Sequence, residues 1–556
     1  MAPILGLTPR LYADARSARW TVISDPIHGH VKRVNCHHLI NSRCEVIEMK
    51  LPGLLSSRDI PTEVAKLWSI VALAILVVSI PAYAQNSRPS TSSPAASSAI
   101  SVKASNDWLQ FRGPNGTGVA DGPTLPAEFG ATKNLAWKAA VPFGRSSPVV
   151  TADRVFLTAS EGDKLVTLAL DRKTGKILWR RDVVRARYMP VFKANDAASP
   201  TPVSDGKNII VFFAELGLIS YGPDGSERWR LPLGPFSSFY GMAGSPVLAG
   251  NTLVLVADQR ANSYIVAVDA RNGKILWKKD RTNYEGWSTP VVYQPKNAPA
   301  QLLVLGSTTL DAYSLDKGER LWWVSKVGAY PKGVPALSGD MIYVNGEGSD
   351  QPFLPPYEDS LKKYDKDNNQ SIQRVEMKGD PFEEHFGWID ANGDGSVDRA
   401  EYDFIRIGTS TSGHGITAVR LSATGGRGDL TPTKVAWRLQ KSYPNIPSLL
   451  VYREVMYLMK EGGIVSSINP ATGEVLKMGR TPGALEEYYA SPVAADGKIF
   501  MVSGSCKVTV LKAGAQWDVL ATNDLDEECW ATPAIAGNSL FVRTRGSLYS
   551  FAERMK

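Results

Sequence analysis

Cysteine and histidine are scarce in this chain, which limits the chemistry that it can carry. Its 556 residues contain 4 Cys and 6 His. Beyond residue 84 only Cys506, Cys529, His385 and His414 remain. A zinc triad or a histidine acid–base pair is therefore hard to build. The sequence leaves open whether Cys506 and Cys529 form a disulfide.

A large excess of charge of one sign is also lacking, because the formal net charge is only +7 and no block of lysine or arginine stands out. A nucleic-acid partner is not expected for such a chain. A G-x-S-x-G elbow and a phosphate-cradling glycine loop are both absent, so neither a hydrolase nor a nucleotide-binding motif is indicated. We predict no catalytic residue.

The longest apolar run, Leu67 to Ile80, has fourteen residues and is short for a membrane span. Lys66 precedes it and Ala82-Tyr83-Ala84 follows, a pattern typical of a signal peptide at 66–84. A retained anchor is the alternative. We expect export to the periplasm or beyond the cell, no membrane span after cleavage, a leader at 1–84, and translation starting near Met49. The Ser/Pro/Ala-rich stretch 85–106 is expected to be a linker.

A repeated unit is the strongest pattern in the remainder. It opens with a small residue, proline and an apolar residue. The prolines concerned are Pro148, Pro202, Pro246, Pro290, Pro335, Pro447, Pro492 and Pro533. Their spacings are 54, 44, 44, 45, 112, 45 and 41 residues. Removing roughly sixty residues from the anomalous interval restores the period.

Each unit contains alternating apolar runs joined by Asp/Asn/Gly turns, a pattern typical of antiparallel strands in hairpins. Four such strands at a period near 45 predict one blade of a β-propeller. Eight prolines predict eight blades in an all-β fold. The last blade lacks a fourth strand, and Asn134 to Val141 is expected to supply it and close the ring. Recurring tryptophans are expected to pack between blades, at Trp179, Trp229, Trp277, Trp322 and Trp437.

The unit G-x-hydrophobic-D-x-x-T-G-K-x-x-W, as at Leu170 to Trp179 and Val268 to Trp277, resembles the pyrroloquinoline-quinone-like (PQQ-like) β-propeller repeat. The segment Asp107 to Gly118 resembles the lead-in of exported bacterial members. The resemblance implies either a quinone-dependent dehydrogenase of alcohols or sugars, or a cofactor-free scaffold such as the outer-membrane assembly lipoprotein. It also implies that a dehydrogenase would hold its quinone under a vicinal Cys-Cys disulfide. No Cys-Cys pair occurs here, so PQQ is the less favoured cofactor and an enzyme the less favoured function.

Aromatic residues stand just before the proline motifs, in segments that join the fourth strand of one blade to the next blade. We expect them to gather at one mouth of the ring, with Glu285, Glu486 and Glu487 among them, and to bind a protein or carbohydrate ligand. The alternative is that these rings only cover strand ends. The candidate residues are Phe239, Tyr240, Tyr284, Trp287, Tyr330, Tyr443, Tyr488, Tyr489 and Trp530.

Two twelve-residue stretches in the long interval space oxygen-bearing side chains as EF-hand calcium loops do, at positions 1, 3, 5, 7, 9 and 12. The first set is Asp365, Asp367, Asn369, Ser371, Gln373 and Glu376. The second set is Asp390, Asn392, Asp394, Ser396 (through its carbonyl), Asp398 and Glu401. Position 6 is Gly395 in the second loop but Gln370 in the first, which should weaken the first site. Position 8 is Ile372 and Val397, which are expected to pair.

An acidic solvated loop and a dockerin-like pair are the alternatives to these EF-hands. We expect a propeller at 107–349 and 408–556, interrupted at 350–407 by the helical EF-hand pair. The expected function is an exported, calcium-binding, ligand- or protein-binding assembly module. A PQQ-dependent dehydrogenase is the second hypothesis.

Overall fold

The computed structural model describes residues 107–553, apart from 121, 123, 186, 190, 192–193, 349–353, 412 and 442, and three strands nearer the N-terminus. The chain divides into two compact units, Met1–Ser93 and Pro94–Lys556. In the first unit β1 (Trp20–Ser24), β2 (Val31–Asn35) and β3 (Glu45–Glu48) form an antiparallel sheet. The expected signal peptide (66–84) and linker (85–106) lie outside the described residues. None of the helices in the described part of the chain combines the length and apolarity that crossing a membrane requires.

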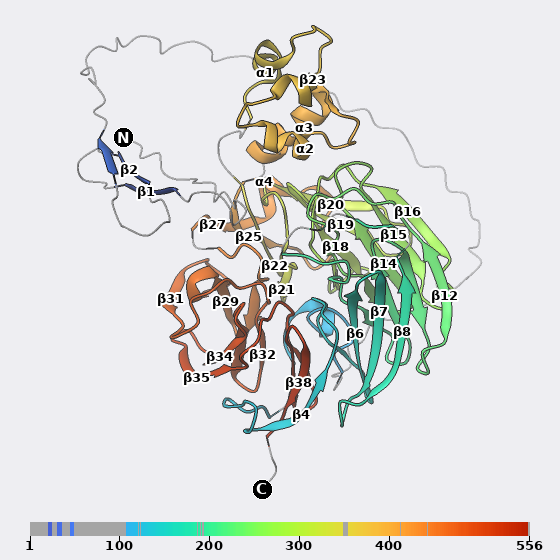
Figure 1. Ribbon diagram of the computed structural model, residues 1–556. Helices are drawn as coiled ribbons and strands as arrows, with labels where there is room; N and C mark the ends of the chain where they lie inside the picture. The colour runs from blue at the N-terminus through green and yellow to red at the C-terminus, as the bar shows by residue number, and fades with distance from the viewer. Residues whose placement is uncertain are drawn as a thin grey trace, which may run out of the picture. The chain divides into compact units, whose positions relative to one another are not determined.

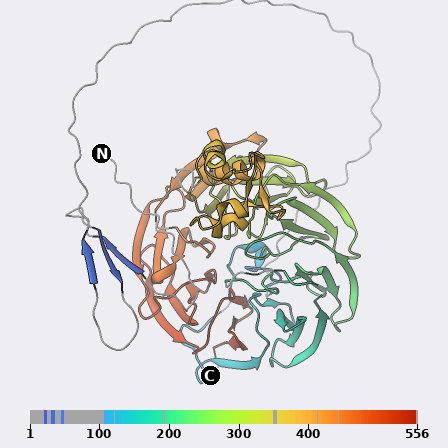
Figure 2. The same ribbon diagram turned by 45° about the horizontal axis from the view of Figure 1, so that its top comes forward.

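The second unit is a ring of eight antiparallel sheets, an eight-bladed β-propeller (Figures 1 and 2). The first two blades are β5 (Val149–Val150), β6 (Arg154–Glu161), β7 (Lys164–Asp171), β8 (Ile177–Val184), and β9 (Val203–Ser204), β10 (Ile209–Phe213), β11 (Gly217–Tyr221), β12 (Glu227–Pro232). The next two are β13 (Val247–Ala249), β14 (Thr252–Ala257), β15 (Tyr264–Asp269), β16 (Ile275–Asp280), and β17 (Val291–Tyr293), β18 (Gln301–Leu305), β19 (Thr309–Ser314), β20 (Arg320–Ser325). The fifth and sixth are β21 (Ala336–Ser338), β22 (Met341–Gly346), β25 (Gly415–Arg420), β27 (Val435–Leu439), and β28 (Leu450–Tyr452), β29 (Val455–Lys460), β30 (Ile464–Ile468), β31 (Val475–Arg480). The last two are β32 (Val493–Ala495), β33 (Lys498–Val502), β34 (Lys507–Lys512), β35 (Asp518–Asp524), and β36 (Ala534–Ala536), β37 (Ser539–Arg543), β38 (Ser547–Phe551), β4 (Leu135–Ala140).

The ring closes as the sequence predicted, because β4 pairs with β38 and becomes the fourth strand of the last blade. First strands of neighbouring blades, such as β9 and β13 or β36 and β5, lie against one another and surround the axis. The second and third strands are buried almost throughout, whereas the fourth strands alternate between buried and exposed residues. The core is therefore a stack of sheet faces between blades, which explains why nearly every strand is strongly apolar.

Tryptophans link neighbouring blades through one repeated contact. Trp229, in β12 of the second blade, donates a hydrogen bond from Nε1 to the carbonyl of Ala270 in the third blade, at 2.9 Å. The ring of Trp229 covers Gly273 in the turn after β15, where a Cβ atom would meet the ring at 2.8 Å. Equivalent indole-to-carbonyl bonds are made by Trp137, Trp179, Trp277 and Trp437.

The remaining predicted tryptophan, Trp322, also packs between two blades but donates to Gln301 of its own blade at 2.8 Å. The reason lies in the next blade, whose connection between third and fourth strands is longer. That connection contains β26 (Gly428–Asp429), which pairs in parallel with β20, and the short helix α4 (Thr431–Lys434). The fourth blade therefore has five strands.

The segment from Trp108 to Ala120 crosses the first strands of several blades. Trp108 pairs with Val150, the last residue of β5, and Leu109 accepts a hydrogen bond from Ser204, the last residue of β9. Further along, the short 3-10 helix η1 (Pro114–Gly116) lies near β17, where the Asn115 amide exchanges two hydrogen bonds with Val292. This segment therefore lies at the end of the first strands where each one turns into the second.

A helical insertion (residues 354–411) separates β22 from β25 in the fifth blade. It contains the helices α1 (Tyr357–Tyr364), α2 (Phe386–Ile389) and α3 (Arg399–Thr411), the 3-10 helices η2 (Arg374–Met377) and η3 (Glu383–His385), and the short strands β23 (Ile372–Gln373) and β24 (Ser396–Val397). Another 3-10 helix, η4 (Glu461–Gly463), lies in the sixth blade. Helix α3 continues past residue 407, the expected end of the insertion, and ends at Thr411.

Cys506 and Cys529 form a disulfide, which the sequence had left open. Cys506 lies between β33 and β34, and Cys529 lies in the connection from β35 to the last blade. The bond thus ties a connection within the seventh blade to the connection that leads from it to the eighth, and both residues are almost completely buried.

Candidate functional site

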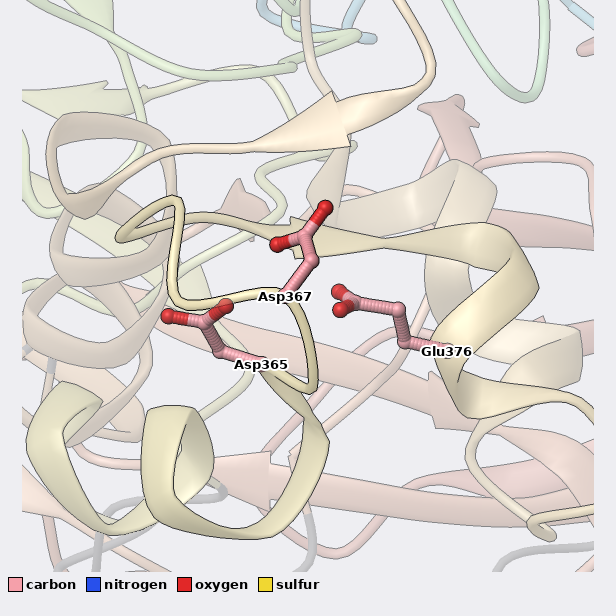
Figure 3. Close-up of side chains that lie close together, drawn as sticks. All are labelled: Asp365, Asp367 and Glu376. Carbon is pink, nitrogen blue, oxygen red and sulfur yellow. The ribbon is translucent and has the colours of Figure 1, made fainter.

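The first candidate calcium loop begins where α1 ends and finishes inside η2. Carboxylate oxygens of Asp365, Asp367 and Glu376 lie within 4.8 Å of one another (Figure 3). Asp365 accepts hydrogen bonds from the backbone N–H groups of Asn369 and Gln370, which curls the loop around it. The Glu376 carboxylate reaches back across the loop and accepts from two more N–H groups, those of Lys366 and Gln373.

The second candidate loop, between α2 and α3, has the same internal pattern. Asp390 accepts from the N–H groups of Gly393 and Gly395, at 2.8 and 3.1 Å. Glu401 accepts from the N–H groups of Asn392 and Asp398, at 2.9 and 3.2 Å. Burial raises the pKa of Glu401, and the neighbouring Asp398 and Asp390 carboxylates raise it further. Bringing these anions together without a cation has a free-energy cost, which a bound cation would relieve.

The two loops are joined back to back. Ile372 of β23 pairs with Val397 of β24 in a two-residue antiparallel ladder, as the sequence predicted for position 8. Both side chains enter an apolar core with residues such as Phe386 and Tyr402. A small cavity of about 160 Å³ remains inside this core. A change in the conformation of one loop can therefore be transmitted to the other through this ladder and core.

The sharp turn at position 6 requires the left-handed backbone region in both loops. Gly395 has φ = 87° and Gln370 has φ = 65°. Glycine reaches this region without strain, whereas a residue with a Cβ pays roughly 1 kcal/mol or more. The structure thus contains the strained turn on which the expectation of a weaker first site rests; the affinities themselves stay a prediction.

The donor set suits a hard cation. Both loops place carboxylates at positions 1 and 12, one carboxylate and one amide at positions 3 and 5, and a backbone carbonyl at position 7. These are oxygen donors of the kind that Ca²⁺ prefers. The convergence of three carboxylates in the first loop is the observation that supports the fit. Neither loop contains histidine or cysteine, whose nitrogen and sulfur zinc prefers.

The helical insertion contacts the ring at the aromatic segments. The second and fourth strands of a blade run in one direction, so connections from second to third strand and from fourth strand to the next blade share one face, here called the loop face. On this face Tyr284 donates a hydrogen bond to the carbonyl of Trp388 in α2, at 2.8 Å. Its ring lies 5.4 Å from that of Phe404 in α3, and Tyr330 lies 6.1 Å from Trp388. The insertion thus shares a core with the loop face.

The nine aromatic candidates do not form one exposed ring. Tyr284 and Tyr488 are exposed by only 4% and 3%, so they do not belong to a ligand-contacting surface in this structure. Tyr284 is covered by the helical insertion, and Tyr488 packs in the core of the sixth and seventh blades. Phe239 is the most exposed candidate, at 40%. The others are half-buried, namely Tyr240, Trp287, Tyr330, Tyr443, Tyr489 and Trp530.

The candidates fall instead into separate groups. Phe239, Tyr240 and Trp287 form one group with ring centroids 5.0 and 5.5 Å apart. Trp530 lies 5.6 Å from Phe143, edge to face, in another part of the loop face. Tyr443 lies 6.2 Å from His414, which therefore has a packing contact.

Glu285 is fully buried rather than exposed among the aromatics. One of its carboxylate oxygens accepts a hydrogen bond from the backbone N–H of Phe239. Burial raises the pKa of Glu285, although the Ser238 hydroxyl and the Phe239 N–H act in the opposite direction. The carboxyl group therefore ties two connections of the loop face together.

Sequence reasoning missed an open hollow of about 910 Å³ near the disulfide. It is lined by Phe143, Ser505, Lys507, Asp524, Asp526, Glu527, Glu528, Arg545 and Gly546. Above the Trp530 ring, at 4.7 Å, lies the guanidinium of Arg145. The acidic run from Asp524 to Glu528 was the available signal, but an acidic run more often marks a solvated turn.

The residues present do not match the quinone site that the family resemblance implies. That site needs a disulfide between adjacent cysteines facing the cofactor. The disulfide of the described chain joins residues 23 positions apart, and Cys506 and Cys529 are 0% and 1% exposed. We therefore derive no reaction step through a quinone.

Comparisons with known proteins agree with the repeat. A family model described as outer membrane protein assembly factor BamB matches residues 117–322 and 243–374. BamB of Burkholderia pseudomallei is 26% identical over 232 residues, 38% of this chain and 51% of that protein. A polyvinylalcohol dehydrogenase of a Pseudomonas species is 26% identical over 152 residues, 24% of this chain and 22% of that enzyme. The chain thus spans about half or less of these relatives' own lengths.

Among solved structures, BamB from Moraxella catarrhalis is similar with a TM-score of 0.47 and 14% identity, covering 75% of this chain and 98% of that one. The family match, the curated relatives and the closed ring of four-stranded repeats lead to one assignment. The chain is a PQQ-like β-propeller repeat protein.

Proposed function

We propose that this chain is an exported, calcium-binding β-propeller that binds a protein partner on its loop face. The observation that carries the proposal is the helical insertion, which combines two calcium-type loops with a core shared with Tyr284 and Tyr330 of the loop face. A metal-dependent lobe at that place would order the surroundings of the binding surface.

In this proposal Ca²⁺ is held by the twelve predicted loop residues, and it supplies charge neutralisation for carboxylates that otherwise repel one another. Glu376 and Glu401 close their loops through hydrogen bonds to backbone N–H groups. We expect dissociation constants on the order of 10⁻⁴–10⁻³ M, typical of extracellular calcium modules.

A protein partner is favoured over a carbohydrate by two kinds of support. The matched relative from Burkholderia pseudomallei is an assembly factor by its name. On the loop-face connections, Tyr188, Phe239 and Leu485 are exposed by 65%, 40% and 54%. Large apolar side chains at half exposure suit a protein interface with an aromatic anchor.

Export is supported by the disulfide between Cys506 and Cys529. Structural disulfides persist in oxidising compartments and are rare in the cytosol. Together with the predicted signal peptide at 66–84, the bond favours a periplasmic or extracellular location.

Site-specific photo-crosslinking tests the partner. A photo-reactive analogue is placed at Phe239 on the loop face, and a matched one at Asn251, in the turn between β13 and β14 on the opposite face. We expect the probe at 239 to yield a discrete cross-link in envelope extract with calcium, weakened by chelator, and the probe at 251 to yield none. Equal products from both positions, or none from 239, would contradict the proposal.

A quinone-dependent dehydrogenase is the second candidate, favoured by the similarity to a polyvinylalcohol dehydrogenase. Its test is the reduction of a dye with alcohols or sugars after adding quinone and calcium to the purified chain. Substrate-dependent turnover would replace the first proposal with this one.

A further inference from the structure

The loop-face connection from β16 to β17 contacts the helical insertion. The same connection is hydrogen-bonded to the exposed aromatic Phe239, which lies between β12 and β13. Tyr284 and Glu285 are consecutive residues. Tyr284 is buried against α2 and α3, whereas the Glu285 carboxylate accepts a hydrogen bond from the backbone N–H of Phe239. Two residues later, Trp287 donates from Nε1 to the carbonyl of Gly241 at 2.7 Å. One short segment (residues 284–287) thus joins the insertion to the segment 239–241.

The contacts on the insertion side come from both ends of the second calcium loop. Trp388, whose carbonyl accepts from Tyr284, stands two residues before Asp390, the first loop position. Phe404, whose ring touches Tyr284, stands three residues after Glu401, the last loop position. The angle between α2 and α3 therefore fixes the distance between the two groups that hold Tyr284.

We infer that occupancy of the second loop by Ca²⁺ controls the order of the segment 239–241 through Tyr284 and Glu285. The inference rests on the proposed calcium binding and adds regulation of the binding surface to it. Calcium draws Asp390 and Glu401 together, which sets α2 against α3 and fixes Trp388 and Phe404 around Tyr284. Segment 284–287 is then held in place and keeps Phe239 and Gly241 in their bonded positions.

The coupling is reciprocal by thermodynamic necessity. If calcium binding strengthens the hydrogen bond from Tyr284 to Trp388 by some factor, that hydrogen bond strengthens calcium binding by the same factor. Removing the Tyr284 hydroxyl must then weaken calcium binding by that factor. The relevant free energy is that of one net hydrogen bond, which corresponds to roughly a fivefold change in an equilibrium constant.

Hydrogen exchange tests the inference without any partner. Exchange at residues 237–241 is followed by mass spectrometry in the full chain, with calcium and with chelator, while equilibrium dialysis measures calcium binding. The variants are Tyr284→Phe and the control Tyr488→Phe. Tyr488 also donates its hydroxyl to a backbone carbonyl at 2.8 Å in a loop-face connection, but it packs away from the insertion.

In the unmodified chain, chelation is expected to accelerate exchange at 237–241 by roughly fivefold. Tyr284→Phe is expected to show fast, calcium-insensitive exchange there and roughly fivefold weaker calcium binding. Tyr488→Phe should behave like the unmodified chain. Calcium binding with unchanged exchange, or identical behaviour of the two variants, would overturn the coupling alone. A lack of calcium binding would overturn the proposed function together with it.

Discussion

Adding one methyl group at Gly273 should destabilise the propeller far more than the same change at Gly250. Both glycines lie in turns of the third blade, with φ of 76° and 60°. A Cβ atom at Gly273 would meet the Trp229 ring at 2.8 Å, whereas nothing lies within 4 Å of a Cβ atom at Gly250. The pair therefore separates the cost of backbone strain from the cost of displacing the tryptophan.

In both alanine variants the left-handed backbone lowers the free energy of unfolding by about 1–2 kcal/mol. This loss is reduced by about 0.4–1 kcal/mol because the unfolded chain becomes stiffer. In Gly273→Ala, overpacking against the Trp229 ring lowers the free energy of unfolding by an additional ~1–3 kcal/mol. We thus expect Gly273→Ala to lose roughly 1–3 kcal/mol more free energy of unfolding than Gly250→Ala.

Guanidinium unfolding followed by circular dichroism measures this difference through the transition midpoints, provided that the slopes agree. Equal midpoints for the two variants would refute the idea that tryptophan packing on a neighbouring turn holds the blades together. A lower midpoint for Gly250→Ala would refute it as well.

Three further predictions concern stability and the calcium loops. Replacing Cys506 and Cys529 by serine should cost about 3.4 kcal/mol of unfolding free energy, from the entropy of a loop closed over 23 residues; an unchanged unfolding midpoint under oxidising conditions would contradict this. Because burial raises the pKa of Glu285, the folded state binds that proton more tightly than the unfolded state does, so stability should fall as pH rises through the folded pKa. Glu285→Gln should remove this part of the pH dependence and raise stability at neutral pH, which unfolding midpoints between about pH 4 and 8 check; parallel curves for both proteins would be inconsistent with it. Gln370→Gly should relieve the left-handed strain and tighten calcium binding in the first loop by up to about fivefold, as measured by equilibrium dialysis; unaltered or weaker binding would count against the strain argument.

The ring could be predicted because its signals repeat. A proline before each first strand and a turn–tryptophan pair at the end of most units marked eight blades, and the orphan strand ahead of Pro148 indicated closure. The pairing of β4 with β38 bears this out. The pairing of Ile372 with Val397 followed from loop spacing alone, since the geometry of such loops depends on local residues.

What depends on contacts between distant elements could not be predicted. Tyr284 looked like an exposed ligand contact, but α2 and α3 cover it. Arg281 gave no signal in sequence, yet it is buried between Asp258, at 2.6 Å, and Asp311, at 3.3 Å. Such residues are singular in the repeat, so no period reveals them. Burial of a charge depends on which side chains surround it in three dimensions.

Equilibrium dialysis of the purified, chelator-treated chain against calcium tests the central claim most directly. We predict two ions per chain in the unmodified protein, one in Glu376→Gln, one in Glu401→Gln and none in the double variant, with dissociation constants on the order of 10⁻⁴–10⁻³ M. No saturable binding, or the same binding in the double variant as in the unmodified chain, would contradict the account.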